Sequence, residues 1–272
     1  VFYDELKKFE IQHEYLATHG PITYGRFESQ TKTFFELANK IVLGVNYIDK
    51  KSWPNHRLLQ FLVVVHNIRT IYSAADRLLK GHWEDTFVLA RVSLEAFIKI
   101  VWLSCYPTHI DNAFVKTKTG RQFNVTSFID DELKLDWHSY KFLSLYSHGQ
   151  IEVIRDWVDI HKGSKQYPIR LQRKFDKFNL EIGLNYLQFL QVAYLRFLIE
   201  VLATGLNDVH LPATLIADAQ EFATAKHESM LQHPKDYWPR VAADLGDILS
   251  LIKAVDGGAE FKKSWKNIRC NP

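Results

Sequence analysis

Hydrophobic and polar positions alternate along the chain with a helical period, because apolar residues recur every three or four positions in most segments. The first such segment runs from about Phe2 to Leu16, and the break at Gly20-Pro21 separates it from a second segment, from about Glu28 to Tyr47. The apolar face of that second segment contains Phe34, Phe35, Leu37, Ile41 and Val42. The pattern therefore predicts two amphipathic helices near the N-terminus.

The middle of the chain is more apolar. A third helix is predicted to follow Ser52-Trp53-Pro54-Asn55 and to run to about Lys80, where Gly81 ends it. A fourth extends from about Trp83 to Cys105, because Pro107 cannot continue it. Later segments are assigned in the same way: a loop at 117–126, a helix from about Ser127 to His148, an ambiguous stretch at 150–160, a long apolar helix from Asn179 to Leu206, a helix opened by Pro212, and a short helix near Val241 to Val255.

These segments predict an all-α fold, a helical bundle with long apolar central helices, in one domain over residues 1–272. Residues 1–50 and 212–272 supply flanking helices. The 12 Gly and 8 Pro are too few for a sandwich of many short strands. With 47% hydrophobic and 24% charged residues, the chain is not a disordered or low-complexity protein.

Two cysteines cannot form a disulfide framework, and no signal segment opens the chain, so we expect a reduced, cytoplasmic setting. The stretch Ile182–Leu206 is long enough to cross a bilayer, but Arg196 and Glu200 interrupt it. No membrane span is therefore expected.

The net charge of +3 does not by itself imply nucleic acid. One local exception is the basic stretch 162–177, whose aromatic neighbours could stack on bases; its cationic residues include Lys165, Arg170, Arg173 and Lys174. RNA is one candidate partner of this stretch. A solvated linker is the alternative, and we favour it.

Motifs for common chemistry are missing from the sequence. There is no phosphate-binding loop, no dinucleotide fingerprint and no nucleophile elbow. One Glu-x-x-His occurs, at Glu10 and His13, on what looks like a surface helix, whereas a di-iron bundle needs two such motifs. We therefore expect neither a metal nor another cofactor.

Polar residues inside apolar helices are the most informative feature. Arg91 and Glu95 lie four apart among apolar neighbours, so they share a helix face. Tyr140, Ser144 and His148 repeat at the same spacing and could face them, with Glu95 orienting His148 as a general base. The alternative, which we favour, is a structural cluster that fixes the packing of two helices.

A second pair with the same order and spacing, Arg196 and Glu200, lies in the long apolar helix. The two pairs could form one charge network in the bundle core. Chance alone could also produce them, because Arg and Glu are common residues.

The Leu89-x-Arg91-x-x-x-Glu95 segment, followed by Tyr-x-x-x-Ser-x-x-x-His-Gly at residues 140–149, resembles an uncharacterised prokaryotic helical family, domain of unknown function 5677. The resemblance covers roughly residues 60–205. It implies an all-helical intracellular protein in a prokaryotic stress or phage-defence setting, of a kind compared with HEPN-type ribonucleases. It implies no established activity.

HEPN ribonucleases use an Arg followed after four to six residues by a His. Two such pairs occur, Arg77 with His82 and Arg155 with His161, which is about the chance rate. The second is the better candidate, because a polar residue, Asp156, follows its Arg.

Two functions follow. We favour a binding module that acts as a homodimer or on a protein partner. The alternative is a metal-independent ribonuclease in which His161 or His148 moves the proton and Arg155 or Arg91 stabilises the phosphate.

Overall fold

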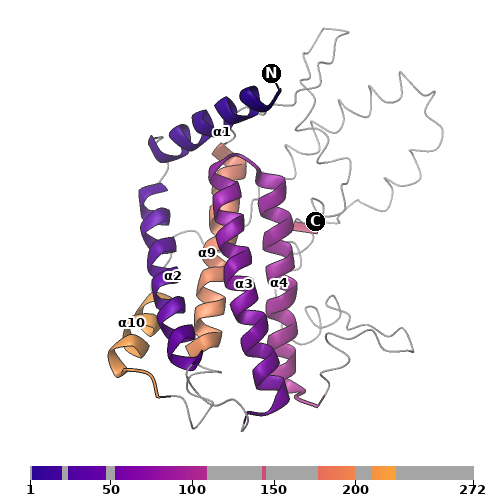
Figure 1. Cartoon of the computed structure of the whole chain (residues 1–272), viewed down its shortest axis with the longest axis vertical. Coiled ribbons are helices and arrows are strands. Elements are labelled where there is room, and N and C mark those ends of the chain that lie inside the picture. Colours follow the sequence, from indigo (N-terminus) through magenta and orange to yellow (C-terminus); the bar gives the residue numbers. More distant parts are fainter. Residues whose placement is uncertain are drawn as a thin grey trace, which may run out of the picture. The chain divides into compact units, whose positions relative to one another are not determined.

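A computed structural model of the chain describes residues 2–19, 24–46, 53–108, 143–144, 177–199 and 210–224, all within one compact unit. These residues contain six helices and no strand, so the predicted all-α fold is confirmed (Figure 1). The helices are α1 (Phe2–His19), α2 (Tyr24–Asn46), α3 (Asn55–Leu79), α4 (Trp83–Cys105), α9 (Lys177–Phe197) and α10 (Ala213–Thr224).

The helix boundaries follow the sequence signals closely. Gly81, predicted to end the third helix, has a φ of +82°, a left-handed conformation that favours glycine, and it makes the turn from α3 into α4. Pro212 directly precedes α10. Residues 143–144 are helical, and the rest of the predicted helix from Ser127 to His148 lies outside the described residues, as do the predictions for 117–126, 150–160 and Val241–Val255.

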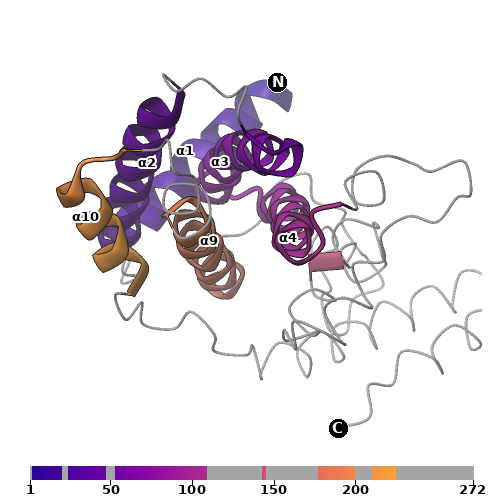
Figure 2. The ribbon, with the colours of Figure 1, turned by 90° about the horizontal axis from the view of Figure 1, so that it is seen from below.

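Helices α3, α4 and α9 pack against one another and form the tightest part of the unit (Figures 1 and 2). Leu78 of α3, Phe87 of α4 and Leu187 of α9 are fully buried. A Cβ added at Gly183 of α9 would lie 2.5 Å from Cδ1 of Leu78, so the glycine allows α9 to approach α3 closely.

Two polar side chains buried in this core form hydrogen bonds across helix boundaries. Gln60 of α3 donates to the carbonyl of Ile100 at 2.7 Å and to the hydroxyl of Ser104 at 2.9 Å, both on α4. Tyr194 of α9 donates its hydroxyl to the carbonyl of Ser93 at 2.7 Å, and burial raises its pKa well above the ordinary value. These bonds fix the relative positions of the three helices.

Helix α2 is attached differently. It contacts α9 and α10 (Figure 2). Its contact with α3 is far smaller than the contact between α3 and α4. Its links to α9 include two side-chain amides, Gln188 donating to Gln30 and Gln191 donating to Thr31, each at 3.0 Å. The face between α2 and α3 is therefore left partly open.

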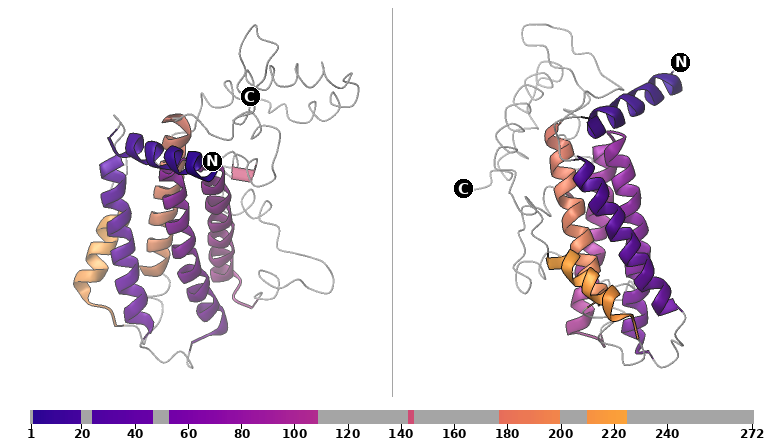
Figure 3. Two further views of the ribbon diagram at one scale, coloured as in Figure 1. Left: turned by 45° about the horizontal axis from the view of Figure 1, so that its top comes forward. Right: turned by 90° about the vertical axis from the view of Figure 1, so that its left-hand side faces the viewer.

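Helix α1 lies across the end of the bundle where α3 turns into α4 (Figure 3). Of the helices in the described ranges, α3 alone has the length and apolar composition to cross a bilayer, and core helices of soluble proteins pass the same test. That makes α3 a weak candidate for a membrane span.

Candidate functional site

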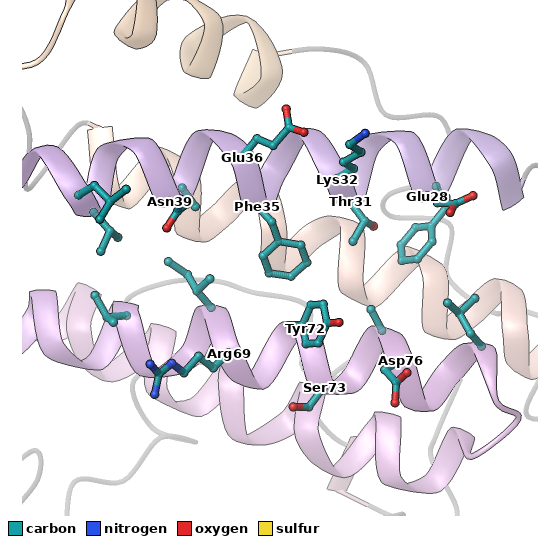
Figure 4. A pocket seen from close by; sticks show the side chains of 18 residues that line it. Glu28, Thr31, Lys32, Phe35, Glu36, Asn39, Arg69, Tyr72, Ser73 and Asp76 are labelled. Atoms are coloured by element: carbon teal, nitrogen blue, oxygen red, sulfur yellow. The ribbon is translucent and has the colours of Figure 1, made fainter.

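A groove of about 1030 Å³ runs between α2 and α3. It is visible in Figure 4, where Phe35 of α2 and Tyr72 of α3 point toward each other. Their rings meet edge to face with centroids 5.5 Å apart. The lining is mainly apolar and comes from both helices: Phe27, Thr31, Phe35, Ala38, Val42, Leu43, Val65, Ile68, Tyr72, Ala75 and Leu79.

The groove is open to solvent and does not form an enclosed cavity. Tyr72 is 62% exposed and Leu43 is 44% exposed, although both line the groove with apolar surface. The walls are long, because the lining residues run from Phe27 to Leu43 on α2 and from Val65 to Leu79 on α3. At 1.5 Å per residue the walls measure about 21–24 Å. The groove is therefore a long open channel.

Charged side chains are distributed unevenly along the groove. Glu28 and Asp76 lie at one end, on opposite walls, and Arg69 lies toward the other end (Figure 4). Lys32 and Glu36 also belong to the lining of α2, but their side chains point away from α3. The two ends of the groove thus differ in charge.

The sequence produces this groove because the apolar arcs of α2 and α3 are wider than one core contact requires. Phe34 is fully buried in the core, while Phe35, about 100° further around α2, faces the groove. On α3, Ile71 is fully buried, whereas the adjacent Tyr72 lines the groove. Two adjacent aromatic or apolar residues on a helix, of which only one can face the core, are the sequence signal for such a groove.

The predicted contact between Arg91 and Glu95 is present on α4, with Nε of Arg91 2.9 Å from Oε1 of Glu95. Their side chains are 15% and 28% exposed, so the pair is not sealed in the core. It is also absent from the lining of the α2–α3 groove.

The partners expected for that pair fall mostly outside the described residues. Ser144 is described and is half-buried. Arg196 of the second predicted pair is exposed. The other predicted site residues lie outside the described ranges: Tyr140, His148, Arg155, His161, Lys165, Arg170, Arg173, Lys174 and Glu200.

A second polar cluster lies where α1 meets the turn between α3 and α4. The helix of Glu10 and His13 has an exposed face, as expected, but these two residues lie on its buried face and are only 8% and 1% exposed. Glu10 contacts Nε2 of His82 at 2.9 Å and Nζ of Lys7 at 2.7 Å. Nδ1 of His13 is 2.7 Å from the carbonyl of Leu79, which identifies Nδ1 as the protonated donor nitrogen.

Packing explains why His13 is buried. Its ring stacks edge-on against Trp83, with centroids 4.9 Å apart, and lies over Gly81, where an added Cβ would be 2.7 Å from Cδ2 of His13. Burial lowers the pKa of His13, and the nearby His82 lowers it further, while the bond to Leu79 opposes both. The side chains of Lys7 and His82 hold the pKa of Glu10 below its ordinary value.

This cluster has one feature of an acid–base pair: the carboxylate of Glu10 orients the part-exposed imidazole of His82. No group of three or more potential metal ligands occurs within the described ranges. The cluster mainly attaches α1 to the rest of the unit.

No family model, curated protein or solved structure matches this chain. The resemblance to domain of unknown function 5677 and to HEPN proteins stays a prediction.

Proposed function

We propose that this protein is a binding module whose binding surface is the groove between α2 and α3. The observation that carries the proposal is the groove itself, an apolar channel of about 1030 Å³ between two helices that barely touch. Exposed apolar surface of this kind is costly in water and marks interaction sites in soluble proteins.

The shape of the groove favours a protein partner over a small molecule. Small-molecule sites enclose most of the ligand surface. Here the groove stays open, and the exposed ring of Tyr72 lies at its centre. Parallel walls of this length are typical of grooves that receive a partner helix.

The proposal is tested by replacing Tyr72 with the photo-crosslinking residue benzoylphenylalanine in cells that produce the full chain. We expect a discrete adduct with another polypeptide after irradiation. Tyr15 of α1 is the matched control, because it is 60% exposed but lies outside the groove lining. Adding Val42→Lys should abolish the Tyr72 adduct while the helical circular dichroism signal is retained. Equal adducts from positions 72 and 15, or none from position 72, would contradict the proposal.

A second candidate function, RNA cleavage, is favoured by one observation, the contact between Glu10 and His82. We propose it as the alternative: the imidazole of His82 would take the proton of a ribose 2′-hydroxyl as its oxygen attacks the adjacent phosphorus, and would give that proton to the 5′-oxygen as the P–O5′ bond breaks. Arg77, exposed at the end of α3, would neutralise the phosphate. Arg77 and His82 are one of the two Arg–His pairs with HEPN spacing.

The alternative is tested by incubating the purified chain with labelled RNA. His82→Asn should abolish cleavage, and His66→Asn, at an exposed position elsewhere on α3, should leave it unchanged. No cleavage by the wild-type protein, or full cleavage by His82→Asn, would exclude this role.

A further inference from the structure

The charges of the α2–α3 groove restrict what it can bind. We propose that its occupant is an amphipathic helix of a partner protein that has a cationic and an anionic side chain about three turns apart, on either side of an apolar patch. This inference rests on the proposed binding function and adds the chemistry of the partner.

Two charged side chains of the groove, Glu28 and Arg69, are available to a partner. Glu28 and Arg69 form no ion pair or hydrogen bond in the described part of the chain. Both are exposed. Other opposite charges of the unit are paired, as in Arg91 with Glu95 on α4 and, at the groove itself, Asp76 with Lys80.

The charges of Glu28 and Arg69 lie well apart along the groove. The rings of Phe35 and Tyr72 face each other, and Glu28 lies seven residues from Phe35 while Arg69 lies three residues from Tyr72. Because α2 and α3 run in opposite directions, Glu28 and Arg69 lie on opposite sides of the two rings, about 15 Å apart along the groove. Glu28 adds a second carboxylate at the Asp76 end, on the other wall (Figure 4). Because Lys80 already contacts both oxygens of Asp76, the carboxylate open to a new cation is that of Glu28.

The surface between the two charges is aromatic. Phe35 and Tyr72 form the middle of the groove, so the matching part of the partner must be apolar. A helix that lies along the groove would present a cation toward Glu28, apolar residues to the two rings, and an anion toward Arg69. About three turns, or eleven residues, separate the charged positions on one face of such a helix.

Direct self-association of two grooves fits less well. If two copies face each other across a two-fold axis along the groove, Glu28 meets the acidic end of the other copy. If the axis runs across the groove, Arg69 meets Asp76, which Lys80 already neutralises. A separate helix, by contrast, can complement both ends at once.

The test uses three stapled 16-residue peptides with the same apolar residues and helicity, which differ only at two positions eleven apart: Lys and Glu, Lys and Lys, or Glu and Glu. Binding to the full chain is measured by fluorescence anisotropy at low salt. We expect the Lys–Glu peptide to bind about two- to fivefold more tightly than the other two.

Variants of the protein must exchange this preference. Arg69→Glu should make the Lys–Lys peptide the tightest binder, and Glu28→Lys should favour the Glu–Glu peptide. Both residues are exposed, so neither variant should alter folding. Lys40→Glu, an exposed charge of α2 outside the groove lining, is the matched control and should leave the ranking unchanged.

The outcomes separate the two proposals. Equal affinity of all three peptides, lost on Tyr72→Glu, would overturn the charge rule and leave the groove as a binding surface. No peptide binding would overturn the inference, and the photo-crosslinking at position 72 then decides the binding function. A dimer in sedimentation that Tyr72→Glu converts to a monomer would identify a second copy as the occupant and overturn the inference.

Discussion

The two sides of α3 differ sharply in how they are packed. On the side of α4 and α9, α3 is closely packed. Leu78 is fully buried, Gly183 of α9 lies directly against it, and Gln60 donates hydrogen bonds to α4. On the side of α2, it presents a groove lined by the exposed Tyr72. Similar apolar residues are thus buried in the core on one side of α3 and remain partly exposed on the other.

Two leucines of α3, one in the core and one exposed, test how much the packed side of the helix stabilises the fold. Leu78 is fully buried and Leu62 is 55% exposed. We expect Leu78→Ala to lower the free energy of unfolding by about 3 kcal/mol, because it leaves a cavity. Leu62→Ala should change it by less than about 0.5 kcal/mol. Urea denaturation measures both, and equal effects would show that burial on the side of α4 and α9 adds no stability.

Two glycines sharpen the same contrast. A Cβ at Gly183 would meet Leu78, and a Cβ at Gly44 of α2 would meet Leu211, each at 2.5 Å. Leu78 is enclosed, whereas Leu211 is half-buried and can move. We expect Gly183→Ala to destabilise by about 1–3 kcal/mol and Gly44→Ala by clearly less. Thermal unfolding checks this, and a larger loss from Gly44→Ala would contradict it.

The attachment of α1 should depend on pH. Because burial lowers the pKa of His13 from its ordinary 6.5, the folded state favours the neutral ring. The resulting stability is complete above pH 6.5 and is lost as the pH falls through the lower folded pKa. Glu10, whose pKa is also lowered, acts in the same direction below its ordinary 4.5.

We therefore expect the melting temperature to fall by a few degrees between pH 7.5 and 5.5, at about 2–4 °C per kcal/mol. His13→Gln, which can still donate to Leu79 but does not titrate, should flatten this dependence. His66→Gln, at an exposed position, should leave it as in the wild type. Identical pH profiles for all three proteins would exclude His13 as the cause.

The smallest effect is expected at the Arg91–Glu95 pair. A sealed pair would cost several kcal/mol to break, but these side chains are 15% and 28% exposed. We expect Arg91→Ala to cost at most about 1 kcal/mol. Chemical denaturation measures it, and a loss near 3 kcal/mol would show that the pair acts as a buried one.

The helical class and most helix boundaries could be predicted from the sequence. Gly81 ends α3 because its φ of +82° suits glycine, and α4 begins at Trp83 and ends at Cys105 as its pattern predicted. The contact between Arg91 and Glu95 also follows from local geometry, because residues four apart share a helix face.

The positions of helices relative to one another could not be predicted in this way. Glu10 and His13 were expected on a surface helix, yet their own side chains are buried because α1 crosses the turn that contains Gly81, a contact between residues about 70 positions apart. Phe34 and Phe35 looked like one apolar face, yet one lies in the core and the other in the groove.

The sequence by itself determined which segments are helices and where they stop, because hydrogen bonding, capping and backbone preference are local. Only the tertiary structure decided that α2 stands apart from α3 and leaves a groove with Glu28 and Arg69 toward opposite ends. The physical reason is that a helix presents residues in every direction around its axis, and only its packing partners decide which of them become core and which remain exposed.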